Sequence, residues 1–243
     1  MPFTTTFSQL SSRAYGEFVS SATPLSVSYV VVGGGGTNNT GNFNFYAGGG
    51  AGGVQTGTTI PALGTPITVT IGAGSFTGGS TVFGSVTAAG STDQLGTSGN
   101  GYSQGASYYA YGGGFYYVST GGGGGALSNG GNGVYFSTTN GAGGTGYTET
   151  LTGTNILVGA GASGDSGVYY APGGYQSAFY PGSHYGTYGY GGADNYGGGI
   201  GVVIISWPTA SHPSLPSTTC TYTSGTNGAN TYMILKSSGT ITF

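Results

Sequence analysis

Short apolar runs separated by glycine set the pattern of this chain. Residues 26–32 begin in alternation and end as Val-Val-Val, and residues 66–71 read Pro-Ile-Thr-Val-Thr-Ile, with the two-residue period of a β-strand. No window carries a 3.6-residue apolar period, so we expect an all-β fold without helices. Weaker or more continuous runs predict further strands at 81–88, 155–158, 200–207, 231–235 and 239–243. The last two runs flank Lys236-Ser237-Ser238 and predict a hairpin.

The strand runs and a polar break divide the chain into four parts. Pro208, Pro213 and Pro216 stand in Ser/Thr-rich sequence, which is typical of an extended linker. The predicted parts are an N-terminal arm (1–25), a glycine-rich β domain (26–207), a linker (208–220) and a C-terminal strand pair (221–243).

Glycine tracts alternate with the predicted strands, and the 243 residues include 57 glycines. Such tracts act as flexible linkers, as polyglycine II helices packed side by side, or as turns and bulges of a β-sandwich. Long tracts such as 121–125 favour polyglycine II, and isolated pairs favour turns. No strict period links the tracts, so a solenoid is not indicated. The tracts lie at 33–36, 48–53, 112–114, 121–125, 141–146 and 197–199.

Aromatic residues form two clusters between the glycine tracts, in segments that we expect to be loops. Packed over glycine, their rings would supply the core that aliphatic residues do not. Exposed, they would form a recognition surface, because tyrosine offers a large amphipathic area at low side-chain entropy. A cell-surface glycan or an outer-membrane protein suits such a surface. The candidates are Tyr108, Tyr109, Tyr111, Phe115, Tyr116 and Tyr117, and then Tyr169, Tyr170, Tyr175, Phe179, Tyr180, Tyr185, Tyr188, Tyr190 and Tyr196.

Charge and chemistry exclude several function classes. Lys and Arg number two and the net charge is −3, so the chain lacks the basic patch of a nucleic-acid binder. The run Gly164-Asp165-Ser166-Gly167 matches the peptide around the nucleophile of chymotrypsin-like proteases, but both histidines, His184 and His212, follow the serine. We therefore expect no enzyme activity and no cofactor.

Metal and disulfide chemistry are also poorly supplied. Asp165 and Asp194 lie in glycine-rich segments, where one carboxylate per site is little for calcium, and we assign no metal ligand. Whether either residue binds calcium stays open at this point. Cys220 is the one cysteine, so no intramolecular disulfide forms.

The start of the chain predicts its compartment. Met1-Pro2-Phe3-Thr4 has no basic region and no long apolar run follows, so we expect no signal peptide. The longest apolar stretches are too short to span a bilayer, which argues against membrane insertion. We expect synthesis in a host cytoplasm and release as part of a larger particle.

Several segments together resemble one family. The run Tyr29-Val30-Val31-Val32 followed by four glycines resembles the opening of glycine-rich domains in bacteriophage tail-fibre proteins. Residues 51–54, 67–74 and 81–84 resemble the segments that follow it, and residues 198–208 resemble the closing strand. The resemblance covers about 26–208. Residues 7–16 are similar, more weakly, to openings of tail-associated proteins of marine cyanophage-like phages.

The resemblance implies a virion appendage with a host-binding tip. In related adhesins of T-even-like phages, polyglycine II helices pack into a sandwich and variable aromatic loops form the tip. The glycine tracts of this chain are shorter and more interrupted, and a C-terminal module follows the closing strand. We expect a glycine-rich β-sandwich-like domain with polyglycine II segments, aromatic loops and a short C-terminal β-hairpin.

The C-terminal module suggests a partner. Residues 230–243 resemble the strand pair that normally precedes the Val-Val-Gly-Gly-Gly-Gly opening, so we expect them to pair with a sheet edge of a neighbouring copy. The expected partners are identical copies, other virion appendage proteins, and a host-surface glycan or protein. The alternative function is a self-assembling filament subunit joined through the aromatic loops and these strands. The predicted subunit contacts are Tyr232, Ile234, Leu235, Ile241 and Phe243.

Overall fold

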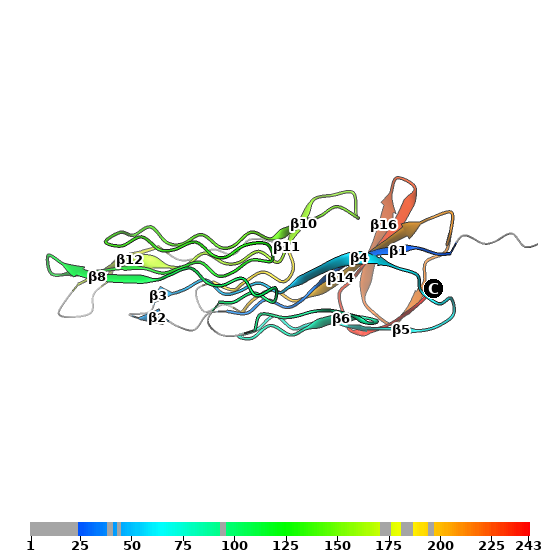
Figure 1. Cartoon of the computed structure of the whole chain (residues 1–243), viewed down its shortest axis with the longest axis horizontal. Coiled ribbons are helices and arrows are strands. Elements are labelled where there is room, and N and C mark those ends of the chain that lie inside the picture. The colour runs from blue at the N-terminus through cyan, green and yellow to red at the C-terminus, as the bar shows by residue number, and fades with distance from the viewer. Residues whose placement is uncertain are drawn as a thin grey trace, which may run out of the picture.

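The chain forms an elongated molecule that contains only β-strands as regular elements in its described part. The computed structural model describes residues 24–37, 41–42, 45–92, 96–170, 176–180, 187–193 and 197–243. Two five-stranded antiparallel sheets lie at one end, and glycine-rich segments run from them to a four-stranded sheet at the other end (Figure 1). The all-β prediction is confirmed for these residues.

The first sheet holds the closing strand of the glycine-rich domain at its centre. Its order is β16 (Tyr222–Asn227), β17 (Asn230–Leu235), β14 (Val202–Pro208), β1 (Val27–Val32) and β4 (Val54–Thr59). β1 and β14 pair antiparallel, with Tyr29 opposite Ile205 and Val31 opposite Val203. The two ends of the predicted domain thus meet as neighbouring strands.

The second sheet faces the first. Its order is β15 (Ser217–Thr218), β18 (Gly239–Thr242), β5 (Ile67–Thr70), β6 (Thr81–Phe83) and β7 (Val86–Ala88). Thr68 and Thr70 are exposed while Val69 between them is buried, as strand alternation requires. This sheet therefore has one solvated face and one face in the core.

The core between the two sheets confirms the sandwich arrangement. Trp207, Met233, Leu235 and Ile241 are among its fully buried side chains. The indole Nε1–H of Trp207 donates to the carbonyl of His212 at 2.9 Å, which satisfies the one polar atom of that ring.

A hairpin covers the outer face of the first sheet. β10 (Tyr147–Glu149) and β11 (Ile156–Val158) pair with one another, and Val158 joins a second apolar cluster with Val30, Val32 and Ile204. β1 and β14 are thus buried on both faces. This explains why their sequences are continuous apolar runs rather than alternations.

The C-terminal strands do not form the predicted hairpin. β17 lies between β14 and β16, whereas β18 lies between β15 and β5 in the opposite sheet. The chain uses residues 236–238 to cross from one sheet to the other, so the two strands cannot pair with each other. The hairpin predicted around 236–238 is wrong, and the C-terminal hairpin of the chain is formed by β16 and β17 instead.

The five residues predicted at a subunit contact lie in the chain's own sandwich. Leu235 and Ile241 are fully buried in the core, and Phe243 packs edge-on against Trp207 with ring centroids 5.4 Å apart. Ile234 and Tyr232 belong to the outer apolar cluster under the β10–β11 hairpin. These strands complete the sandwich of their own chain, and a contact of these five residues with a neighbouring copy stays a prediction.

The predicted linker also belongs to the sandwich. Within 208–220, β15 pairs with β18, and Cys220 is buried in the core. His212 packs against Trp207 and Phe243, with ring centroids 6.5 Å and 5.8 Å away. Pro208 is the last residue of β14, and its carbonyl accepts the amide of Ser211, so the segment turns back onto the sandwich instead of forming an extended spacer.

Two polar strands that the apolar pattern does not mark close the edges of the first sheet. β4 and β16 each carry a glycine that faces a tyrosine of the neighbouring strand, Gly57 opposite Tyr29 and Gly225 opposite Tyr232. Each tyrosine ring lies where a glycine Cβ would stand. Polar edges discourage pairing with other chains, and the rings cover the weak glycine positions.

Backbone hydrogen bonds join the glycine-rich segments into one body, which we name the glycine bundle. Its segments are 33–37, 47–53, 72–79, 89–91, 96–105, 120–133, 139–146, 158–165, 187–193 and 197–201. Successive amides of a tract point to different neighbours, and every third amide returns to the same one. In the first tract the bonds run from Gly33 to Gly53 (2.9 Å), Gly34 to Gly79 (2.8 Å), Gly35 to Gly199 (2.8 Å) and Gly36 to Gly50 (2.9 Å).

Close approach, not backbone conformation, requires glycine in these tracts. None of the glycines at 33–36, 48–53 and 121–125 has a positive φ. A Cβ on Gly33, Gly35 or Gly123 would stand within 3.0 Å of a carbonyl group of a neighbouring segment. Side chains are therefore excluded at these glycine positions.

This packing predicts that Gly123→Ala destabilises the protein by about 3 kcal/mol or more, because the added methyl group overlaps the carbonyl of Gly49. Gly197→Ala is the matched control, since its Cβ would meet only ordinary contacts at 3.6 Å. We expect its effect to stay within about 0.5 kcal/mol. Chemical denaturation of the two variants measures the difference, and equal midpoints would contradict the close-approach argument.

The strand order predicts that the chain cannot fold without residues 221–243. Their removal takes away β17 and β18, which provide Leu235 and Ile241 to the core. We expect a truncated chain to lack a cooperative unfolding transition in calorimetry. A truncated chain that unfolds at the same temperature as the full chain would show that these strands are an appendix.

Candidate recognition tip

The predicted aromatic loops are largely strands of the distal four-stranded sheet. Its order is β13 (Gln176–Tyr180), β12 (Ser166–Tyr170), β9 (Phe115–Ser119) and β8 (Tyr108–Gly112). Tyrosine and phenylalanine favour strands, and both β8 and β9 carry them in runs. The loop prediction for these segments is wrong. A short ribbon of β2 (Gly41–Asn42) and β3 (Phe45–Tyr46) is the remaining pair of strands.

A two-residue turn fixes the outermost hairpin. Gly113 and Gly114 connect β8 to β9 with φ values of 60° and 86°. Tight hairpin turns need positive φ at both central positions, which glycine adopts without strain. The rings of β8 and β9 are therefore carried on a regular hairpin rather than on a long loop.

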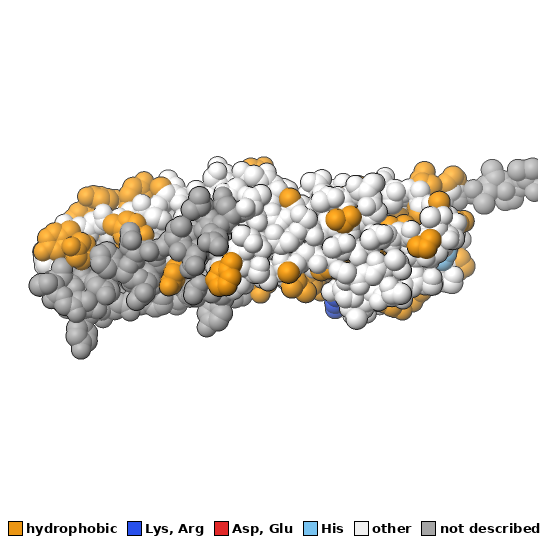
Figure 2. All heavy atoms as spheres, turned by 90° about the horizontal axis from the view of Figure 1, so that it is seen from below, with side chains coloured by type: hydrophobic (Ala, Val, Ile, Leu, Met, Phe, Trp, Pro, Cys, Tyr) orange, Lys and Arg blue, Asp and Glu red, His pale blue; other side chains and the backbone are white. Residues whose placement is uncertain are grey.

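One face of this hairpin displays tyrosine rings to solvent. Tyr109 and Tyr111 are 37% and 59% exposed and lie two residues apart on the edge strand β8. Tyr116 stands opposite Tyr111, with ring centroids 4.9 Å apart. Figure 2 shows hydrophobic side chains gathered at this end of the molecule. We name these three residues the tyrosine shelf.

The other face is covered by a short aromatic segment that we did not select as a site. The ring of Phe136 lies 5.4 Å from that of Tyr117, and the ring of Tyr135 lies 6.2 Å from that of Tyr108. Tyr135 and Phe136 are themselves 61% and 48% exposed. The run Val134-Tyr135-Phe136 between glycine tracts was the available signal for this segment.

Phe136 holds an unusual backbone conformation. Its φ of 55° is the one positive value for a non-glycine residue among the described positions. Its ring lies over Gly112, where a Cβ would come within 3.0 Å of the ring. Glycine at this site thus makes room for an aromatic side chain that closes the face.

The second aromatic cluster is divided between three places. On the backbone ladder, Tyr169 stands opposite Tyr116, and Tyr170 stands opposite Phe115. Phe179 and Tyr180 lie on β13, opposite Gly167 and Ser166. Tyr175, Tyr185 and Tyr196 lie outside the described residues.

Two residues of that cluster do not belong to the tip. Tyr188 packs on the outer face of the first sheet, in the cluster that contains Val158. The ring of Tyr190 lies against Gly199 within the glycine bundle. Both follow the core interpretation of tyrosine rather than the recognition interpretation.

A polar network joins the tip to the bundle. The carboxylate of Asp165 accepts the amide of Tyr46 at 2.7 Å, and the amide of Asp165 donates to the carbonyl of Tyr46 at 2.9 Å. The hydroxyl of Thr120 donates to the carbonyl oxygens of both residues. Asp165 is fully buried just before β12. Its bonds with Tyr46 and Thr120 therefore fix the start of that strand. No described group of three or more His, Cys, Asp or Glu side chains could hold a metal ion.

The described surface of the tip carries no formal charge. Residues 96–148, which include β8, β9 and the segment 134–136, contain no Asp, Glu, Lys or Arg. Both carboxylates of the described residues, Asp165 and Glu149, are fully buried. Lys236, the one Lys or Arg among the described residues, lies between β17 and β18 of the sandwich. Between residues 96 and 148 the tip therefore offers rings, hydroxyls, side-chain amides and backbone groups.

Glu149 is a buried acid in the β10–β11 hairpin. Its carboxylate accepts the amide of Thr152 at 3.1 Å and the hydroxyl of the same residue at 3.2 Å. Burial raises the pKa of this carboxyl above its ordinary value, although the bonds from Thr152 and Leu151 act in the opposite direction. The folded chain therefore holds the Glu149 proton more tightly than the unfolded chain.

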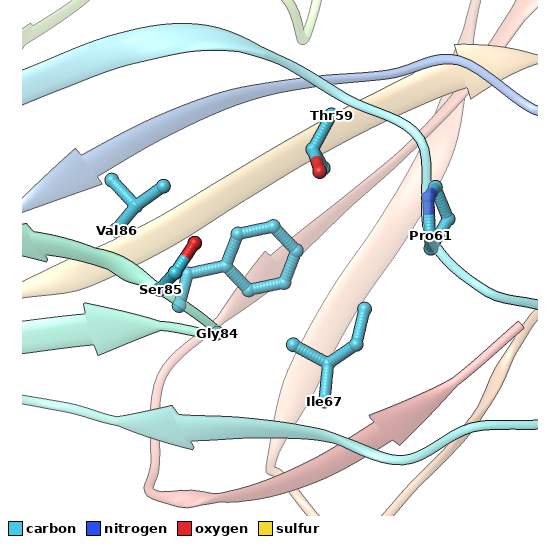
Figure 3. Close-up of a pocket in the computed structure, with 7 residues that line it drawn as sticks. Thr59, Pro61, Ile67, Gly84, Ser85 and Val86 are labelled. Atoms are coloured by element: carbon cyan, nitrogen blue, oxygen red, sulfur yellow. The ribbon is translucent and has the colours of Figure 1, made fainter.

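A small pocket lies in the sandwich, away from the tip. It measures about 190 Å³ and is lined by Thr59, Pro61, Ile67, Phe83, Gly84, Ser85 and Val86. Figure 3 shows these side chains around the space between β4 and the β6–β7 turn.

In the described part of the chain, no helix has the length and apolarity to span a membrane.

Comparisons of this chain with protein-family models, with curated proteins and with solved structures found no match. The resemblance to tail-fibre proteins thus stays a prediction.

The raised pKa of Glu149 predicts a pH-dependent stability. Because the folded state binds this proton more tightly, the group favours folding at acid pH, and that contribution is lost as the pH rises through the folded pKa. We expect Glu149→Gln to flatten the decline in stability from about pH 4 to about pH 7. Urea unfolding of both proteins across this range measures it. Parallel curves for the two proteins would contradict the assignment.

Proposed function

We propose that this protein is a structural appendage of a virion, a tail-fibre or fibre-tip adhesin that presents its distal aromatic sheet for attachment to a host surface. The observation that carries the proposal is the exposed tyrosine shelf at the far end of an elongated body. A core would bury these rings, yet Tyr111 is 59% exposed at the outermost hairpin.

The body between the sandwich and the tip suits a spacer. We infer that its tracts are polyglycine II helices packed side by side. The three-residue period of the lateral hydrogen bonds and the absence of positive φ at 33–36, 48–53 and 121–125 support this inference. Backbone bonds in several directions make a stiff body with few side chains, which holds the tip away from the sandwich.

The arrangement also favours a non-enzymatic role. The serine of the protease-like run, Ser166, donates to the carbonyl of Thr138 at 2.5 Å and is fully buried at the start of β12. His212 is far from β12 in the sequence. Among the described carboxylates, only Asp165 stands next to that strand. We therefore assign Ser166 a structural role at the start of β12 and no catalytic role.

A filament subunit is the second candidate. The open outer edges of β4 and β16 in the sandwich and of β8 at the tip would allow strand pairing between copies. Polar residues on β4 and β16 weigh against spontaneous pairing there, and this ranks the filament second. Negative-stain imaging over a range of concentrations separates the two: regular filaments favour the second candidate, and discrete particles favour an adhesin.

Attachment to cells tests the first candidate. We expect the combined variant Tyr109→Ser, Tyr111→Ser and Tyr135→Ser to bind a susceptible bacterial strain at least about tenfold more weakly, because exposed aromatic anchors dominate recognition surfaces. The wild-type chain, labelled with a dye, is first screened against a panel of strains by flow cytometry. Tyr222→Ser is the matched control, since Tyr222 is 42% exposed but lies on β16 of the sandwich.

The unfolding temperature of each variant is measured in parallel. Unchanged attachment by a folded triple variant would contradict a recognition role for the tip. Equal loss in the Tyr222→Ser control would point to a general surface effect instead.

A further inference from the structure

We infer that the tyrosine shelf of Tyr109, Tyr111 and Tyr116 binds an uncharged glycan. This inference rests on the proposed function, because it names the chemical class of the ligand at the same tip. Sheet position, exposure, charge and size each restrict what the shelf accepts.

The shelf lies on the edge hairpin of the distal sheet, where Tyr109 and Tyr111 are exposed and Tyr116 is half-buried. Tyr109 and Tyr111 project from the same face of β8, because they are two residues apart on one strand. The strand spacing puts them roughly 7 Å apart along it. Tyr116 adds a third ring beside Tyr111, at a tilt of 48°. An elongated ligand can lie along such a row and contact several rings at once.

The charge of the region excludes ligands that depend on ion pairs. Residues 96–148 contain no Asp, Glu, Lys or Arg, and the nearby Asp165 is fully buried. Among the described residues of the tip, no cation is present to pair with an anionic polymer. No exposed carboxylate is present there to pair with a cationic peptide. The ligand that fits is one whose polar groups are hydroxyls.

Aromatic rings and phenol hydroxyls match a sugar in two ways. The apolar faces of a pyranose ring can lie on the face of a tyrosine, and its hydroxyls can exchange hydrogen bonds with the phenol, which both donates and accepts. The hairpin turn at Gly113-Gly114 fixes the strands that carry the rings, so little order has to be created on binding.

The size of the shelf argues against a protein as its main partner. A stable protein interface buries about 800 Å² on each side. Three aromatic side chains bury roughly 150–250 Å² each when fully covered, and these rings are already partly covered. The available area is that of a short oligosaccharide. Weak single-site binding is then strengthened by the several copies in a particle.

The test uses the full chain and defined probes. Maltohexaose, cellohexaose, chitohexaose and mannohexaose are the neutral probes, and dextran sulfate is the anionic one. Saturation-transfer NMR detects contact, and titration gives the dissociation constant. We expect at least one neutral hexasaccharide to bind, with an affinity that changes less than about twofold between 50 mM and 500 mM salt, because no charges meet.

Two variants locate the site. Tyr111→Ala is expected to weaken binding of that hexasaccharide about tenfold, as the loss of one stacked ring predicts. Tyr222→Ala, at an exposed tyrosine of the sandwich, is expected to leave the affinity unchanged. Binding to no neutral probe, binding to dextran sulfate alone, or equal affinity of Tyr111→Ala and wild type would each overturn the glycan inference.

Cell attachment separates this inference from the proposed function. Cells of a strain that binds the chain are treated either with periodate, which cleaves sugar diols, or with a protease. Attachment that is lost after periodate supports the glycan. Attachment that survives periodate and is lost after protease overturns the glycan inference but leaves the adhesin in place. The absence of attachment to every strain, together with no binding of a neutral probe, would remove both.

Discussion

The body of this protein depends on direct hydrogen bonding between backbones that no side chain separates. In an ordinary sandwich, apolar side chains fill about 10 Å between sheets, and glycine only weakens the strands. In the glycine bundle the amide of Gly123 reaches the carbonyl of Ala162 at 2.8 Å, and a methyl group on Gly123 would overlap Gly49. The backbone entropy that glycine loses on folding is offset by bonds in several directions and by close contact. The glycine bundle therefore positions everything beyond the sandwich.

The glycine bundle also determines where large side chains can lie. Its interior accepts alanine, serine and threonine at few positions, and large residues of its segments, such as Phe76, Tyr102 and Leu127, are exposed. At one end, Trp207, Met233 and Leu235 fill a conventional core. At the other, the chain returns to a β-sheet whose rings cannot all be covered by four short strands. The exposed tip is thus a consequence of the same constraint that makes the body thin.

The sequence predicts the sandwich strands well and the connections between them poorly. The apolar runs at 26–32, 66–71 and 200–207 correspond to β1, β5 and β14, since burial on one or both faces leaves a clear pattern. The polar strand β4 leaves none, because it is an edge strand stabilised by pairing and by the ring of Tyr29 over Gly57. The different destinations of β17 and β18 are equally invisible, because a crossing of three residues has the same composition as a tight turn.

At the tip, composition identifies the right residues but not their geometry. The aromatic runs of β8 and β9 read as loops in the sequence, because the flanking glycines hide the strand ends. Tyr190 carries the same local signal as Tyr111, yet it packs against Gly199 inside the bundle while Tyr111 faces solvent. The two tyrosines differ in exposure because they lie at different distances from the end of the glycine bundle, and that distance is a property of the whole fold. A tyrosine beside a bonded tract covers glycine, and a tyrosine beyond the last tract has only its own sheet to cover. The exposure of the tyrosine shelf therefore depends on how far the glycine bundle extends, and on the turn at Gly113 and Gly114 that closes the outermost hairpin.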